Sequence, residues 1–251
     1  MSNYNFFFSP TGGTRKVAEA VADGWGEAIT PVDLLTGEDL PRLCADDVCL
    51  VAGPSYGGRV PAPVVETLQK LDGNGAAAVL IAVFGNRAID DTLVELYDVL
   101  KSANFRCLAG LEAVAQHSLM PRYGTGRPDE KDRAELGEAA RKIRSAMEQG
   151  TLSGEPKLPG SRPYRSYNGV PLKPAATSAC IRCGICAAQC PVGAIPTENP
   201  RMTDPKKCIS CMHCVAVCPK NARKLNGLMR TVASLKMKKT CSDRKENRLY
   251  L

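Results

Sequence analysis

The sequence predicts a doubly wound α/β domain with a five-stranded parallel sheet, followed by a small α+β module rich in cysteine. Three observations lead to this expectation. Apolar, strand-like runs alternate with amphipathic segments over residues 1–150. Eight of the twelve cysteines then fall in two copies of one pattern, 28 residues apart. A stretch with five prolines and no helical or strand periodicity, residues 151–177, lies between the two regions.

The elements of the first region follow from the spacing of its apolar residues. Short apolar runs bounded by turn residues indicate strands, whereas a 3.6-residue spacing indicates helices. The run at 76–84 is apolar throughout, as expected of a parallel strand that is buried on both faces. With strand order 2-1-3-4-5, ligands are expected beyond the carboxyl ends of the strands. The expected strands are 5–8, 29–34, 48–52, 76–84 and 107–115, and the expected helices are 12–26, 62–71, 89–103 and 129–148.

The loop after the first strand, Ser-Pro-Thr-Gly-Gly-Thr at positions 9–14, has the chemistry of a phosphate site. Free amides, the helix dipole and hydroxyl groups converge where a strand turns into a helix. A Walker A loop is excluded because no Gly-Lys-Ser/Thr follows, and the dinucleotide fingerprint G-x-G-x-x-G is absent from the chain. The loop is similar to the flavodoxin pattern S/T-x-T-G-x-T, with Gly13 where Asn is common. The matching positions are Ser9, Thr11, Gly12 and Thr14. An ordinary glycine-rich turn is the alternative.

Two further loops follow the third and fourth expected strands and are predicted to lie beside the first loop. A flavin ring needs a flat apolar platform and backbone groups at its polar edge. Tyr56 is expected to stack on such a ring, and the Gly85–Asn86 peptide to approach its edge. A packing role for Tyr56 and a plain surface charge for Arg87 are the alternatives. The candidate residues of these loops are Pro54, Ser55, Tyr56, Gly57, Gly58, Phe84, Gly85, Asn86 and Arg87.

The cysteine runs follow the pattern C-x2-C-x2-C-x3-C-P, which binds iron–sulfur cubanes through thiolates. In two-cluster proteins the fourth cysteine of each run binds the cluster of the other run. Zinc sites and disulfides are the alternatives, but zinc more often uses separated C-x2-C pairs. The sequence therefore predicts one [4Fe-4S] cluster on Cys180, Cys183, Cys186 and Cys218, and a second on Cys190, Cys208, Cys211 and Cys214.

With these motifs located, the chain resembles a family of anaerobe proteins that fuse an N-terminal flavodoxin-like domain to a bacterial two-cluster ferredoxin. The resemblance implies FMN as the flavin and electron transfer as the activity. We expect a flavodoxin-like FMN domain at 1–150, a linker at 151–177, a two-[4Fe-4S] ferredoxin domain at 178–225, and a basic C-terminal helix and tail at 226–251.

The charge of the chain is uneven, and this bears on its partners. The net charge is +7, and residues 220–251 hold ten Lys/Arg against two Asp/Glu. Apolar residues at helical spacing over 225–235 predict a helix there, which either packs on the ferredoxin domain or docks an acidic redox partner. The sequence has no secretion signal and no membrane span, which together with the thiolates indicates the cytoplasm. We expect no nucleic-acid partner.

Two other functions fit the same motifs. The flavin could reduce a small molecule, such as a quinone or a nitro compound, with electrons supplied by the clusters. No carboxylate pair or Cys/His dyad supports a particular substrate, so no catalytic side chain is predicted. Alternatively, the first domain could be a flavin-free docking module that carries a ferredoxin.

Overall fold

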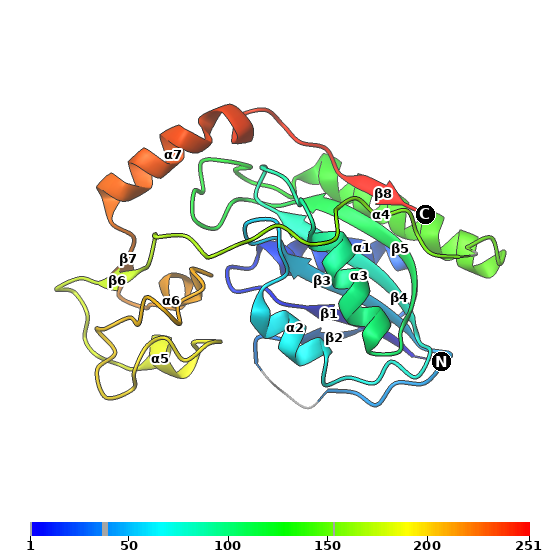
Figure 1. Ribbon diagram of the computed structural model, residues 1–251, viewed down its shortest axis with the longest axis horizontal. Helices are drawn as coiled ribbons and strands as arrows, with labels where there is room; N and C mark the ends of the chain where they lie inside the picture. The colour runs from blue at the N-terminus through cyan, green and yellow to red at the C-terminus, as the bar shows by residue number, and fades with distance from the viewer. Residues whose placement is uncertain (1, 37–39, 153) are drawn as a thin grey trace.

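The structure, a computed structural model, describes residues 2–36, 40–152 and 154–251. Positions 1 and 37–39 of the expected first domain and position 153 of the expected linker lie outside the described residues. Figure 1 shows a layered sheet domain, a smaller module beside it, and a helix that returns from the module to the sheet.

The sheet has the predicted parallel order β2-β1-β3-β4-β5. Its central strand pairs, β1 with β3 and β3 with β4, run in continuous register from Val48 onward. Small boundary shifts apart, every predicted strand is present. The strands are β1 (Asn3–Phe7), β2 (Thr30–Asp33), β3 (Val48–Pro54), β4 (Ala77–Phe84) and β5 (Arg106–Val114).

Helices cover both faces of the sheet, which explains the unbroken apolar run of β4. Alternate β4 residues enter two separate cores, with Leu80 in one and Ile81 in the other. The first core lies under α2 and α3, and the second lies under α1 and α4. The four helices are α1 (Gly13–Trp25), α2 (Ala62–Leu68), α3 (Thr92–Ser102) and α4 (Glu130–Glu148).

A sixth strand, β8 (Arg248–Tyr250), corrects the predicted count of five strands and lies within the segment expected to be a basic tail. β8 pairs antiparallel with β5, with Tyr250 opposite Gly110. The Tyr250 hydroxyl donates a hydrogen bond to Glu112 Oε2 at 3.0 Å. The prediction missed β8 because a three-residue strand with polar neighbours has no periodic signal. It forms because β5 would otherwise expose an unpaired edge.

The segment before β8 is attached to the first domain by hydrogen bonds. The Asn86 side chain donates to the backbone oxygens of Cys241 and Asp243, at 2.6 and 2.9 Å. It also accepts from the Lys245 amide at 3.1 Å. Arg244 forms ion pairs with the carboxylates of Asp129 and Asp132. The tail is therefore a structural part of the flavodoxin-like domain, and some of its basic residues are engaged within the chain.

A buried ion pair, Arg127 with Asp132, lies beneath this tail, with both side chains almost fully buried. Asp132 also accepts from the Asn247 amide at 3.0 Å. We expect Asp132→Ala to lower the free energy of unfolding by roughly 3–5 kcal/mol, because it leaves the Arg127 charge buried without its partner. Urea unfolding measures this. Glu138→Ala, which breaks an exposed pair with Lys142, is the control and should cost no more than about 1 kcal/mol.

The second module is small and irregular. Two short strands, β6 (Ala175–Ala176) and β7 (Arg223–Lys224), pair antiparallel and close it. Two single-turn helices, α5 (Ile185–Ala188) and α6 (His213–Ala216), come from the two cysteine runs. The repeat in the sequence is thus repeated in the structure.

The expected linker lies against the first domain. The Arg165 and Ser161 amides donate to the Asp91 carboxylate at 2.7 and 2.9 Å. The Tyr164 hydroxyl bonds to Asp98. The Gly57 backbone lies directly against the Tyr167 ring, so a side chain at position 57 would overlap the ring. The linker is therefore held along the first domain over most of this stretch.

Helix α7 (Gly227–Cys241) matches the predicted C-terminal helix but packs elsewhere than expected. Its buried face lies on the 119–123 segment of the first domain and on Leu172, not mainly on the ferredoxin module. The Tyr123 hydroxyl donates to the Ser234 carbonyl oxygen at 2.6 Å and fixes this position. In Figure 1, α7 spans the gap between β7 and β8 above the sheet.

Candidate flavin cavity and iron–sulfur centres

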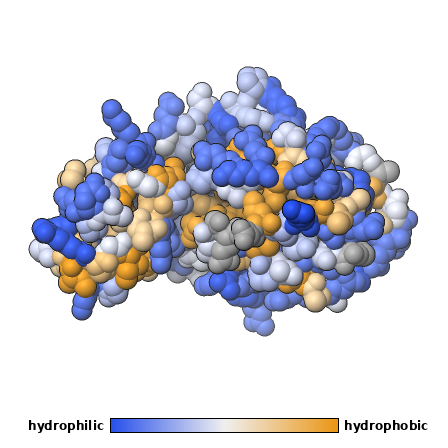
Figure 2. Space-filling model, turned by 90° about the horizontal axis from the view of Figure 1, so that it is seen from below, coloured by the Kyte–Doolittle hydropathy of each residue, from blue (hydrophilic) through white to orange (hydrophobic). Residues whose placement is uncertain are grey.

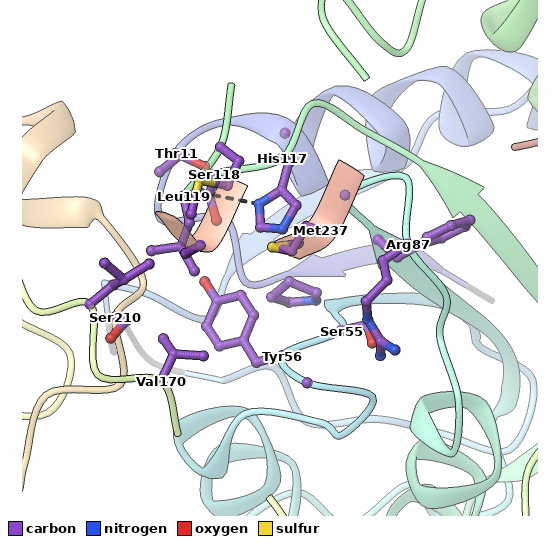
Figure 3. Close-up of a pocket in the computed structure, with 18 of the residues that line it drawn as sticks. Thr11, Ser55, Tyr56, Arg87, His117, Ser118, Leu119, Val170, Ser210 and Met237 are labelled. Atoms are coloured by element: carbon purple, nitrogen blue, oxygen red, sulfur yellow. Dashed lines mark hydrogen bonds between the residues drawn. The ribbon is translucent and has the colours of Figure 1, made fainter. Parts of the chain in front are cut away.

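The three predicted loops meet at one cavity of about 700 Å³ at the carboxyl ends of the strands. A volume of this size is typical of sites for small ligands and cofactors. Figure 3 shows Tyr56 near its centre, with Arg87 and Ser210 on opposite sides. Of the predicted residues, those that line the cavity are Ser9, Thr11, Gly13, Thr14, Pro54, Ser55, Tyr56, Gly57, Phe84, Gly85 and Arg87.

Three predicted residues do not line the cavity. Gly12 caps α1 in the left-handed conformation, with φ 86°. Gly58 lies against the Asp90 side chain, and its carbonyl accepts from the Asp91 amide at 3.0 Å. The Asn86 side chain is turned away to bind the C-terminal tail. Gly12 and Gly58 therefore shape their loops, and Asn86 anchors the C-terminal tail.

The first loop is organised for an anion at the start of α1. Ser9 Oγ accepts from the Arg15 amide at 2.9 Å, and Gly12 N donates to the Ser9 carbonyl oxygen at 3.3 Å. These bonds curl the loop around the helix N-terminus, where free amides and the helix dipole favour negative charge. Thr11 and Thr14 add hydroxyl groups at the cavity wall.

Tyr56 has an environment that keeps its phenol neutral. Burial, together with the nearby Cys211 and Tyr167, raises the pKa of Tyr56 well above its ordinary value. Cys211 belongs to the second cysteine run, so Tyr56 lies between the cavity and that run. Arg59, in the same loop, pairs with Glu95 at 2.6 Å and stacks on Tyr164, which makes its role structural.

His117 lines the cavity next to Gly85. A Cβ on Gly85 would lie 2.7 Å from His117 Cγ, so only glycine allows this approach. The Leu119 amide donates to His117 Nδ1 at 3.2 Å, which requires Nδ1 to be unprotonated (Figure 3). Burial, with the positive charge of Arg87, lowers the pKa of His117 to about 4. The imidazole is therefore neutral at physiological pH.

This pKa gives a pH dependence. Because the folded pKa lies below the value of about 6.5 for an exposed histidine, the unfolded chain binds the proton first as pH falls. Stability is thus lost as pH drops from about 6.5 towards 4. Between pH 7.5 and 5.5 we expect wild type to lose about 1 kcal/mol more than His117→Gln. Anaerobic thermal unfolding of both proteins tests this, and parallel pH profiles would contradict it.

Much of the cavity wall comes from segments that were not predicted to contribute. One part is the 115–120 segment after β5, and another is the 170–172 end of the linker. The apolar face of α7 was visible in the sequence as helical spacing, but nothing in the sequence placed it here. The wall residues from the second module and α7 are Ile209, Ser210, Leu228, Met229, Val232, Ala233, Lys236 and Met237.

Ser210 provides a test of whether the cavity fits a polar ligand. Its side chain is buried, it lines the cavity, and among the described residues its Oγ has no hydrogen-bond partner. A buried hydroxyl without a partner is costly unless a ligand or water supplies one. The cavity therefore combines an apolar wall, which suits a flat ring, with a phosphate-type loop and an unsatisfied hydroxyl, which suit polar groups.

The eight run cysteines gather around two further small cavities. One is lined by Cys180, Cys183, Cys186 and Cys218, and the other by Cys190, Cys208, Cys211 and Cys214. These are the two sets expected from the sequence, each with three cysteines from one run and one from the other. We call them the first and second cysteine cavity. All eight side chains are free thiols, which excludes disulfides among them in this structure.

A single zinc ion and an iron–sulfur cluster place different demands on these thiols. Zinc needs its ligands at about 2.0–2.3 Å from one centre. Within residues 2–36, 40–152 and 154–251, no group of three or more His, Cys, Asp or Glu side chains forms such a site. Arg223 adds support, because it is buried beside the first cysteine cavity and its Nε–H has no partner among the described residues. Hydrogen bonds to cluster sulfur use such donors.

The flavin cavity and the second cysteine cavity share a wall. Ile209 lines both, whereas none of the described residues lines both the flavin cavity and the first cysteine cavity. His213, between two cysteines of the second run, has Nδ1 2.8 Å from the carbonyl oxygen of Pro10 in the phosphate loop. Its Nε2 lies 3.2 Å from Gln189 Oε1. The two modules are thus in contact through residues of both candidate sites.

One family model matches part of the chain. Residues 179–222 match the family model for the 4Fe-4S dicluster domain. No curated protein matches the chain. No helix within the described residues has the length and apolarity needed to cross a membrane.

Solved structures similar to the chain match its N-terminal part. A Streptococcus pneumoniae flavodoxin is 20% identical, with 59% of this chain and 99% of that chain covered at TM-score 0.42. A Fusobacterium nucleatum flavodoxin bound to flavin mononucleotide is 12% identical, with 60% and 99% covered at TM-score 0.41. Rubredoxin oxygen:oxidoreductase from Desulfovibrio gigas is 15% identical, with 61% and 37% covered at TM-score 0.43.

The strand order and the cysteine match together define the class of protein. The chain joins a flavodoxin-like α/β domain to a 4Fe-4S dicluster segment, which is the organisation of a flavodoxin–ferredoxin fusion.

Proposed function

We propose that the chain is an electron-transfer protein that binds FMN in the large cavity and one [4Fe-4S] cluster in each cysteine cavity. The observation that carries this proposal is the shared wall at Ile209, because it joins a flavin-type site to a cluster-type site within one chain. The proposed units are the flavodoxin-like domain at 1–150, the linker at 151–177, the ferredoxin domain at 178–225 and the C-terminal helix and tail at 226–251.

When bound, FMN takes up two electrons and can release them singly, and each cluster carries one. The residues of the chain bind and shield these groups. The loop at 9–14 supplies amides and hydroxyls for the phosphate, and Tyr56 supplies an aromatic wall that stays neutral. The backbone at Gly85 lines the cavity where the ring edge would lie, and Ile209 would exclude water between the two sites.

Linking the modules keeps them at high local concentration, so no diffusional encounter is needed between them. Redox partner proteins, acidic where they dock, would exchange electrons with the chain. A cytoplasmic location belongs to the same proposal because cluster ligation requires reduced thiolates.

Anaerobic reductive titration tests this function. We expect the purified protein to take up about four electrons per chain, two at the flavin and one at each cluster. Visible spectra follow the flavin and EPR follows the clusters. Uptake of about two electrons, without flavin bleaching, would contradict the FMN assignment and favour a docking domain that carries a ferredoxin.

A second function, reduction of a quinone or nitro compound, is supported by one observation. The cavity extends past the predicted loops to an apolar wall of α7 that includes Leu228, Met229 and Val232. We therefore compare Val232→Trp, which would fill the cavity, with Leu235→Trp, which is exposed and outside it. If only Val232→Trp slows quinone reduction while transfer to a protein acceptor is unchanged, the reductase function is supported.

A further inference from the structure

The two cysteine runs have the same spacing but opposite exposure. In the first run, Ile181 is 58% exposed and Ile185 is 37% exposed. At the equivalent positions of the second run, 28 residues later, Ile209 and His213 are only partly exposed. The contrast is sharper at the central cysteines, because Cys183 is exposed whereas Cys211 is 8% exposed. The same loop is therefore covered in one copy and open in the other.

The first domain provides the cover over the second run. Ile209 and Ser210 line the flavin cavity, and His213 contacts the phosphate loop at Pro10. Nothing from the first domain lines the first cysteine cavity among the described residues. The second cysteine cavity thus faces inward to the flavin cavity, and the first faces outward to solvent.

The outward loop has a distinct surface chemistry. Its exposed apolar residues Ile181 and Ile185 line the first cysteine cavity together with Arg182 and Lys220, both exposed. Every charged side chain among the described residues that line this cavity is a lysine or an arginine. Figure 2 shows hydrophobic surface beside strongly hydrophilic surface at the end of the molecule formed by this module. An apolar centre with a charged rim is the composition of protein docking sites.

We propose that this surface, Ile181, Arg182, Ile185 and Lys220, is the docking site for a one-electron carrier protein with an acidic rim. The inference rests on the proposed function, since it requires a cluster in the first cysteine cavity. Docking here exchanges a single electron: the cluster is oxidised by one electron, the partner's cofactor is reduced by one, and no bond or proton moves. The reverse exchange uses the same contact.

Helix α7 fits this role less well, although it is also basic and partly apolar. Three of its exposed apolar residues, Leu228, Met229 and Val232, line the flavin cavity. Its other face packs on the first domain. Its basic residues Lys238 and Lys239 line none of the three cavities. Lys238 and Lys239 therefore serve as matched controls for the docking site.

The test compares two double variants with equal charge change, Arg182→Glu/Lys220→Glu and Lys238→Glu/Lys239→Glu. The probe is an acidic plant-type [2Fe-2S] ferredoxin, and the readouts are its Kd for the intact holoprotein and the bimolecular transfer rate at several ionic strengths. We expect the first variant to weaken binding and slow transfer about tenfold at low salt, and the second to change both less than about twofold. Ile181→Gln should weaken binding more than Leu235→Gln.

Iron content and EPR of each variant separate the possible failures. Intact clusters with equal losses in both double variants, or a larger loss in the α7 variant, would overturn the docking site while leaving the proposed function standing. A wild type without clusters would remove the proposed function and this inference together. Binding to vesicles of phosphatidylglycerol and phosphatidylcholine that only Arg182→Glu/Lys220→Glu abolishes, with no affinity for the ferredoxin, would assign the surface to a membrane and overturn it as well.

Discussion

Changing Cys180 and Cys218 together to alanine should leave one complete cluster. Changing Cys180 and Cys190 together to alanine should leave none. Both variants lose two thiols. The first variant loses both from one cluster set, whereas the second loses one from each set. Cys180 and Cys218 line the same cavity, although they are 38 positions apart in the sequence. Cys180 and Cys190 belong to the same run and line different cavities. If each run bound its own cluster with all four of its cysteines, the two results would be exchanged. The crossed sets, in which the fourth cysteine of each run binds the other cluster, therefore predict the opposite outcome.

The reason is that a cubane needs a thiolate at each iron corner. The Cys180→Ala/Cys218→Ala variant should retain about four iron atoms per chain with the EPR signal of an intact [4Fe-4S] centre. The Cys180→Ala/Cys190→Ala variant should retain no fully ligated centre. Iron and sulfide analysis with EPR measures this, and the Cys44→Ala/Cys107→Ala variant, outside the runs, controls for thiol loss. An intact centre in Cys180→Ala/Cys190→Ala would contradict the crossed sets.

Replacing Thr14 by valine should lower the affinity for FMN by about ten- to a hundredfold. The Thr14 hydroxyl is at the cavity wall in the first turn of α1, and a hydrogen bond to a charged phosphate contributes roughly 1.5–3 kcal/mol. Valine has the same shape, so the fold should be unchanged. Fluorescence titration of the deflavinated protein gives the Kd, and the double variant Thr11→Val/Thr14→Val should bind more weakly still.

The control for this prediction is Thr231→Val on α7. The Thr231 hydroxyl donates to the Gly227 carbonyl oxygen within its own helix at 3.0 Å, and Thr231 does not line the flavin cavity. It should leave FMN affinity within about twofold of wild type. Equal Kd values for wild type and Thr14→Val would mean that the loop at 9–14 does not hold the phosphate.

Local patterns predicted the elements well because their causes are local. The β4 run is apolar since both faces are covered, and α1 has one apolar stripe since only one face is. The spacing of the cysteines similarly reflects the geometry of one loop, and it anticipated how the structure groups them. The strand order could be inferred because alternating strands and helices allow few arrangements.

Contacts between distant segments could not be predicted in this way. The Asn86 side chain binds backbone atoms of the tail about 155 positions later, and no pattern around Asn86 signals this. Ser210 and Arg182 occupy equivalent positions of the repeat, yet one is buried at the flavin cavity and the other is exposed. Only the docking of the modules distinguishes them, and that depends on the shape of two folded surfaces.

The most direct test of the proposed function is the amount of FMN and iron released from anaerobically purified protein on denaturation. We expect about one FMN and about eight iron atoms per chain. Iron at this level without flavin, even after reconstitution with FMN, would contradict the flavin site and leave the loop at 9–14 as an ordinary turn in a domain that carries a ferredoxin.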